Sequence, residues 1–201
     1  MTTQTEPLMI ATIRIEGVTP LLFGGMIDRN AFPKKSRESH DDYERRTWRE
    51  RAHASPDGRL YVPALALKRM FESTARQQGD RIKGAGMKTW TSKMRTGLQA
   101  ECDMALDPAT LKNEVTALWK SVPADGKPGG AKRVPRAFPI VASWGGEFSV
   151  LLLDSSIQPE ILENYARKAG ILNGLGTWRP QTGGNFGRFR VTSIQWSELG
   201  D

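Results

Sequence analysis

The chain has 201 residues, 38% of them hydrophobic and 25% charged, a composition that predicts one soluble globular core. The 29 lysines and arginines exceed the 22 acidic residues, so the net charge of +7 favours polyanionic partners such as nucleic acid or an acidic membrane surface. The single cysteine, Cys102, excludes an internal disulfide and a cysteine-rich zinc site, and we expect a small buried side chain there. Neither an apolar run of about 18 residues nor a signal-peptide pattern is present, so we expect a cytoplasmic protein with no membrane-spanning segment.

The first predicted element is a strand. In "MIATIRIEG" (9–17) apolar and polar residues alternate, which is typical of a strand with one solvated face. No period persists over 18–58, a charged segment too long for an ordinary connection, in which only "DDYERRTWRER" predicts a short helix. A short strand, "RLYVP", then precedes a helix that begins at Pro63 and ends at Gly79.

Less regular regions follow this helix. Residues 76–95 carry six basic side chains against one acid, contain Gly84 and Gly86 as helix breakers, and predict a basic flexible arm. The stretches 97–106 and 114–123 predict strands, although the second is equally compatible with a helix. The next segment, "PADGKPGGAKRVPRAFP", is rich in proline, glycine and basic residues and predicts an exposed tip, not a core element.

The last third of the chain predicts a strand, a helix and a strand. "GGEFSVLLLD" (145–154) is typical of a buried strand, and 156–170 repeats the helix pattern before a final strand over 186–196. The order strand, loop, strand, helix, strand, strand, helix, strand predicts an α+β fold of ferredoxin-like or RRM-like type, with an antiparallel sheet, two helices and long inserted loops. We expect a single RRM-like nucleic-acid-binding domain over 1–201, with inserted arms at about 24–58, 79–97 and 120–138.

A glycine-rich stretch, "GLGTWRPQTGGNFGRF" (174–189), joins the second helix to the last strand. It is neither a dinucleotide fingerprint nor a P-loop, because its glycines follow a helix and no Gly-Lys-Ser/Thr ends the run. Glycines let backbone N–H groups approach a phosphate, arginines neutralise it, and aromatic rings stack on bases. The alternative is a tight structural hairpin with both rings in the core and the arginines in solvent. The predicted nucleic-acid-binding residues are Gly174, Gly176, Trp178, Arg179, Gly183, Gly184, Phe186, Gly187, Arg188 and Arg190.

Three motifs, "RIEGVTPLLFGG", "GRLYVPALALKRMFESTAR" and "GLGTWRPQTGGNFGRFRV", resemble in this order the CRISPR RAMP superfamily. The resemblance implies an RRM-like core that binds single-stranded nucleic acid, and subunits that assemble along guide RNA in antiviral defence. It also implies basic binding positions on the first helix at Lys68 and Arg69. The closing motif is similar to that of uncharacterised phage-encoded proteins as well, so the cell implied is bacterial or phage-infected.

Two further basic segments are candidate binding sites. In the arm, a tryptophan lies between lysines, a pattern that suits stacking on a single strand and neutralising it, and burial of that tryptophan is the alternative. The tip could follow phosphates, or it could keep a protein-protein arm in solution. The candidates are Lys83, Lys88, Trp90 and Lys93 in the arm and Lys127, Lys132, Arg133 and Arg136 in the tip.

The histidines bear on catalysis, because a sister branch of the resembled superfamily cleaves RNA with histidine as general base. Both His40 and His53 come into question, and "SHDDYERR" offers His40 with Tyr43 close by. A lone histidine in a charged loop is more often an ordinary solvated residue. The acids of the same segment favour surface ion pairs over a metal site.

We therefore expect a protein that binds single-stranded RNA or DNA without catalysis, cofactor or metal. It would assemble along the strand as a homo-oligomer or within a multi-subunit nucleoprotein complex, with no membrane partner. An RNA-processing endoribonuclease using His40 and Tyr43 is the first alternative. The second is a homo-oligomeric scaffold whose positive charge is incidental.

Overall fold

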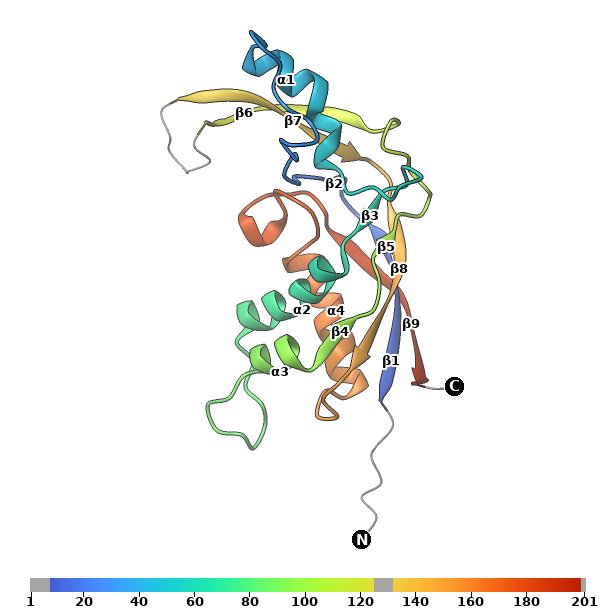
Figure 1. Ribbon diagram of the computed structural model, residues 1–201. Helices are drawn as coiled ribbons and strands as arrows, with labels where there is room; N and C mark the ends of the chain where they lie inside the picture. Colours follow the sequence, from blue (N-terminus) through green and yellow to red (C-terminus); the bar gives the residue numbers. More distant parts are fainter. Residues whose placement is uncertain (1–7, 125–131, 200–201) are drawn as a thin grey trace.

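The computed structural model describes residues 8–124 and 132–199, and its longest sheet runs along one side of the molecule with helices packed against it (Figure 1). No helix within these residues is long and apolar enough to cross a membrane. The elements in chain order are β1 (Met9–Gly17), β2 (Leu21–Leu22), α1 (His40–Thr47), a 3-10 turn (Trp48–Arg51), β3 (Tyr61–Val62), α2 (Ala64–Gln78), α3 (Trp90–Thr96), β4 (Leu98–Ala100), β5 (Met104–Ala105), β6 (Thr116–Pro123), β7 (Arg133–Val141), β8 (Gly145–Leu152), α4 (Pro159–Leu172), a second 3-10 turn (Pro180–Thr182) and β9 (Phe189–Glu198).

The main sheet has the strand order β4-β8-β1-β9, and every neighbouring pair is antiparallel. In the chain, α2 lies between β1 and β4, and α4 lies between β8 and β9. With the remaining elements set aside as insertions, this is the βαββαβ connection of a ferredoxin-like fold. The predicted α+β fold with an antiparallel sheet is therefore confirmed.

The core lies between the main sheet and the helices. Ala11, Ile13 and Ile15 alternate along β1 and are at most 2% exposed, so the period of two in the sequence places one face of this strand in the core. Leu67 and Phe71 of α2 are fully buried in the same cluster. Burial of each large apolar side chain contributes about 1.5–3 kcal/mol to folding.

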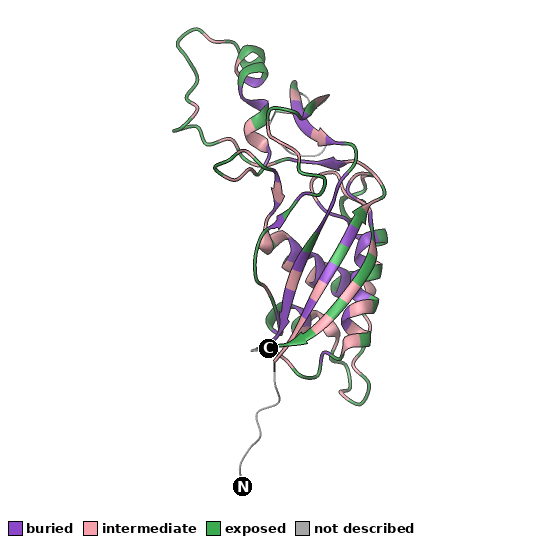
Figure 2. Cartoon of the chain, turned by 90° about the vertical axis from the view of Figure 1, so that its right-hand side faces the viewer, coloured by how far each residue is buried: buried purple, intermediate pink, exposed green. Residues whose placement is uncertain are grey.

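The opposite face of the main sheet is not covered by a helix (Figure 2). It carries two ion pairs between neighbouring strands, Arg190 with Glu16 at 2.7 Å and Arg14 with Glu147 at 4.0 Å, and Arg14 also pairs with Asp107, which follows β5. No aromatic side chain stands among the strand residues that share this face in the described part of the chain. The open face therefore offers no base-stacking surface.

A second sheet, which we call the upper sheet, has the order β2-β7-β6 and lies above the main sheet in Figure 1. Its strand β7 corrects the prediction of an exposed tip, because it contacts α1 and the first 3-10 turn and buries Phe138. β7 pairs with β2 only at its last two residues, so Pro135 lies beyond β2 at a free part of the edge. Pro139 needs no N–H for its contact there, because its carbonyl oxygen accepts the N–H of Phe23 at 2.9 Å. Residues 125–131, including the candidate Lys127, lie outside the described residues.

The structure tests four other expectations for the middle of the chain. Residues 114–123 form a strand, β6, and not a helix. The predicted flexible arm contains a helix, α3, because Met94 is fully buried and Trp90 packs partly against the core. The stretch 97–106 divides between β4 in the main sheet and β5, which pairs with β3. The prediction that Cys102 is buried was wrong, since it lies exposed where the chain passes between these sheets.

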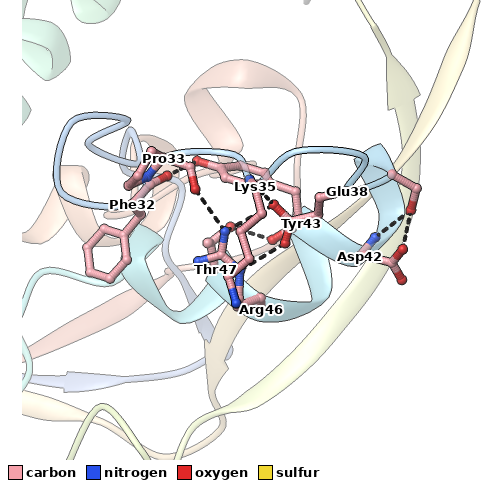
Figure 3. A network of polar contacts seen from close by, with 9 residues as sticks. Phe32, Pro33, Lys35, Glu38, Asp42, Tyr43, Arg46 and Thr47 are labelled. Carbon is pink, nitrogen blue, oxygen red and sulfur yellow. Dashed lines mark hydrogen bonds and ion pairs between the residues drawn. The ribbon is translucent and has the colours of Figure 1, made fainter.

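The loop after β2 is attached to α1 by a network of polar contacts (Figure 3). Tyr43 Oη donates a hydrogen bond of 3.0 Å to the carbonyl oxygen of Phe32. Arg46 donates to Glu38 at 2.9 Å and to the carbonyl oxygen of Pro33 at 3.0 Å. The charged segment that lacked any period in the sequence is thus held in place by side chains of its own short helix.

Substituting Glu38 by glutamine tests this network. The hydrogen bonds from Arg46 and from the Lys35 N–H lower the pKa of Glu38 to about 2, below its ordinary value of 4.5. A carboxylate with a lowered pKa contributes stability above its ordinary pKa and loses it as the pH falls toward the folded value. We therefore expect urea unfolding to show wild type more stable than E38Q at pH 7, with the difference shrinking from about pH 4.5 downward. A difference that stays constant down to pH 3 would contradict the assigned pKa.

Candidate nucleic-acid interface

The glycine-rich loop between α4 and β9 lies against the first turns of α2 and against β2. Two adjoining cavities, each of about 280 Å³, open along this contact and share Pro63, Ala66, Gly176 and Arg179. We call them together the α2 groove. The groove brings the predicted glycine loop together with Arg69, one of the two predicted basic positions of the first helix, whereas Lys68 lines neither cavity.

Contrary to the expectation from the sequence, most glycines of the loop do not present their N–H groups to a ligand. Four of their N–H groups donate within the protein: Gly174 to Ala169, Gly183 to Pro180, Gly184 to Arg179 and Gly187 to Pro20, at 2.8–3.0 Å. The expectation that these four present N–H groups to a phosphate is therefore wrong. Only Gly176, which lines both cavities, has an N–H that finds no acceptor among the described residues.

Close backbone packing explains why glycine is needed there. A Cβ atom at Gly184 would stand 1.7 Å from the carbonyl oxygen of Trp178, and one at Gly187 would stand 1.8 Å from that of Leu175. Gly187 also has a φ of 69°, a region that residues with a side chain rarely adopt. The loop is a folded hairpin whose backbone segments touch, so the structural alternative accounts for most of its glycines.

The two aromatic residues of the loop form a cluster with the upper sheet. The ring of Trp178 lies 4.6 Å from that of Phe138 and 6.4 Å from that of Phe186, between centroids. Trp178 and Phe186 are each half-buried, so part of each ring still faces solvent. Their stacking on bases stays a prediction.

The three predicted arginines of this region lie in three different environments. Arg179 lines the groove, where its Nη1 donates to the carbonyl oxygen of Gly176 at 3.0 Å and its Nε donates to Gln181 at 2.9 Å. Burial lowers the pKa of its guanidinium, which remains charged at neutral pH. Arg188 is half-buried, and its Nε finds no acceptor within the described chain. Arg190 lies on the open sheet face, paired with Glu16.

Lys68 and Arg69 lie on the first two turns of α2, and Arg69 lines the groove beside Arg179. Neither residue forms an ion pair with any acid in the described part of the protein. Their charge is therefore available to a ligand, as the resemblance implies.

The predicted arm lies away from the groove. Lys83 and Lys88 follow the C-terminal end of α2, whose 15 residues span about 22 Å, and Figure 1 shows this loop at the far end of the helix layer. Trp90 is partly buried against the core, and Lys93 pairs with Asp154 at 2.6 Å. The structure does not bring these four candidates together with the glycine loop.

The predicted binding residues of the tip that the structure describes also lie in different places, none of them in the α2 groove. Lys132 and Arg133 are exposed on the β6–β7 hairpin, where Arg133 donates hydrogen bonds to Ser121. Arg136 is half-buried and faces a different cavity, together with His40 and Tyr43. That cavity lies beneath α1 and is separate from the groove.

The histidine of the α2 groove is His53. From the sequence alone, this residue is a possible catalytic histidine without a partner. Its ring packs between Phe23, at 6.3 Å, and Tyr61, at 5.8 Å. Burial lowers the pKa of His53, so its imidazole is neutral at pH 7. No sequence signal could have selected it, because its groove neighbours come from β2, α2 and the glycine loop. Among the described residues, no cluster of histidine, cysteine and carboxylate side chains could hold a metal ion.

No protein-family model matches the chain, and no curated protein matches it. Among solved structures, it is similar to a chain in the cryo-EM structure of the Type III-B Cmr-beta bound to cognate target RNA, with a TM-score of 0.55 and 15% sequence identity. The match covers 96% of this chain and 61% of the other, so this chain spans less than two thirds of its structural neighbour. At this identity the likeness shows the fold alone.

Proposed function

We propose that the protein is a RAMP-type subunit that binds single-stranded RNA in the α2 groove without cleaving it. The observation that carries the proposal is the convergence of Arg69, Arg179 and the free N–H of Gly176 at the first turns of α2. The net charge of +7 and the fold shared with a chain of an RNA-bound complex support it. The resemblance of the three sequence motifs points to the same class of protein.

Each part of the groove has a role in this proposal. Arg69 and Arg179 in the groove neutralise phosphates, together with Lys68 next to Arg69 on α2, and the helix N-terminus adds a favourable partial positive charge. Gly176 donates its N–H to a phosphate oxygen. The exposed edges of Trp178 and Phe186 stack on bases at the side of the groove nearest the upper sheet.

The double variant K68A/R69A tests the groove by fluorescence anisotropy with a labelled single-stranded RNA. We expect its affinity to fall about tenfold, which corresponds to about 1.4 kcal/mol, because two cations leave the phosphate path. The slope of log K against log salt should become shallower by about 1.4, at about 0.7 per phosphate on a single strand.

The matched control is K83A/K88A, which removes the same charge from the loop that follows α2. We expect a loss of no more than about twofold from the weaker long-range field. Equal losses of RNA affinity in the two double variants would show that the α2 groove is not the RNA-binding site. Duplex RNA and single-stranded DNA of the same length establish which nucleic acid is preferred.

Assembly along the strand is part of the proposal. Mass photometry with RNAs of increasing length should show complexes that gain whole protein copies as the RNA lengthens. Self-association of equal extent without RNA, together with no RNA affinity, would favour the scaffold alternative.

The endoribonuclease alternative now rests on His53, because this neutral imidazole shares the groove with Arg179 whereas His40 does not. We expect no cleavage of RNA by the wild-type protein in the absence of metal ions. Cleavage that is lost in H53A and kept in H40A would replace the binding-only proposal with a metal-independent nuclease.

A further inference from the structure

A second polar cavity, of about 220 Å³, lies beneath α1 in the upper part of the molecule. Its wall includes three arginines from three segments: Arg29 from the loop after β2, Arg51 from the first 3-10 turn and Arg136 from β7. His40, Tyr43 and Glu44 of α1 complete the polar lining. None of these residues lines the α2 groove.

The charges of this cavity do not balance. Among the described residues, Glu44 is the only carboxylate that lines it, is 1% exposed, and pairs with Arg51 at 2.9 Å. Its Oε1 also accepts the backbone N–H of Ala137 at 2.9 Å. Glu44 is thus fully occupied by one arginine and one backbone group, which leaves two guanidinium groups uncompensated.

Arg136 shows the consequence. Its Nε is buried and finds no hydrogen-bond acceptor in the described part of the protein. Burial and then the charges of Arg51 and Arg29 lower the pKa of Arg136, against the opposing effect of Glu44. Leaving a buried donor unpaired is costly, and proteins accept that cost at places where a ligand satisfies the donor.

The wall of the cavity is held in place before any ligand arrives. The bidentate Arg51–Glu44 pair joins the 3-10 turn to α1, and Arg51 Nη1 also donates to the carbonyl oxygen of Gly25. The loop that carries Arg29 is attached to α1 by the network of Figure 3. Pre-positioned donors lose little entropy when a ligand binds.

We propose that this cavity binds a phosphate group through Arg136 and Arg29. A phosphate carries up to two negative charges, matches the two uncompensated guanidiniums, and offers oxygens to the unpaired Nε of Arg136. Its source is either a free phosphate ion or a phosphate of the RNA, and the second case rests on the proposed function. The site itself does not depend on the groove.

The first experiment uses inorganic phosphate alone, so it is independent of RNA binding. We expect phosphate to raise the midpoint of thermal unfolding of the wild-type protein, and calorimetry to give a dissociation constant in the millimolar range or tighter. In R136Q and in R29Q the affinity should fall at least about tenfold. The control R133Q, on the exposed part of the same strand, should bind phosphate like wild type.

Folding of the variants does not confound this test. R136Q removes a half-buried guanidinium that neighbouring arginines repel, so without phosphate it should unfold at the same or a higher urea concentration than wild type. Arg29 is exposed, so R29Q leaves the core unchanged. No stabilisation of wild type by phosphate up to about 20 mM, or equal stabilisation of R136Q, would overturn the proposal.

A second arm identifies the source. If the phosphate belongs to RNA, R136Q should weaken RNA binding and inorganic phosphate should compete with RNA in wild type but not in R136Q. If it is a free ion, R136Q should bind RNA as wild type does while still losing phosphate. If neither wild type nor any variant binds RNA, the proposed function is wrong, but the result with inorganic phosphate is unaffected.

Discussion

Replacing Gly187 by alanine is expected to lower the free energy of unfolding by about 2–5 kcal/mol and to disrupt the glycine loop. The estimate adds about 1–2 kcal/mol for a side chain at a positive φ to about 1–3 kcal/mol for overpacking. The added Cβ would stand 1.8 Å from the carbonyl oxygen of Leu175, which cannot move without breaking the hydrogen bond between Leu175 and Gly187. Urea unfolding followed by circular dichroism measures the loss.

Gly183 provides a matched control in the same loop. Its φ is 79°, but a Cβ added there meets nothing within 4 Å. We expect G183A to lose only about 1 kcal/mol, the conformational cost alone. Similar losses in the two variants would mean that the packing of the loop backbone is not what requires glycine.

The second large effect is expected from the substitution of Glu44 by glutamine. Breaking a buried ion pair by removing one partner costs about 3–5 kcal/mol, because it leaves the other charge uncompensated. Here the remaining charge is Arg51, whose side chain is 11% exposed and which shares its cavity with Arg29 and Arg136. Urea unfolding of E44Q measures the effect, with E38Q as the control for a less buried pair and a much smaller expected loss.

The double variant E44Q/R51Q separates charge from shape. Removing both charges should restore part of the stability lost in E44Q, since no buried guanidinium then remains without its partner. A double variant no more stable than E44Q would show that the uncompensated charge of Arg51 is not what destabilises E44Q.

Local patterns in the sequence predicted the main fold. The alternation around Ile13 identified the first strand, and Pro63 and Gly79 marked the bounds of α2, where Gly79 adopts a φ of 64°. These signals depend on neighbours in the chain, because strand period and helix ends are local properties. The order of strands and helices along the chain then predicted the ferredoxin-like sheet.

The remaining features depend on residues distant in sequence. The N–H of Gly187 bonds to Pro20, so no pattern inside the glycine stretch could show that this group is already used. The strand β7 was missed because Pro135 is allowed only by the free edge that the sheet leaves there. The phosphate cavity combines Arg136 with Arg29, and only the assembled upper sheet brings them together.

The two ends of the described chain lie side by side, where Leu199 donates a hydrogen bond of 2.7 Å to Leu8. The strand β9 runs ten residues, about 33 Å, from the glycine loop to this point, which Figure 1 shows at the foot of the sheet. A short linker could therefore join the ends, with new ends opened at the exposed Gly84, and the circularly permuted chain should keep its fold. A dye or surface tether attached near Leu199 would likewise leave the groove unobstructed, which suits single-molecule measurements of loading onto RNA.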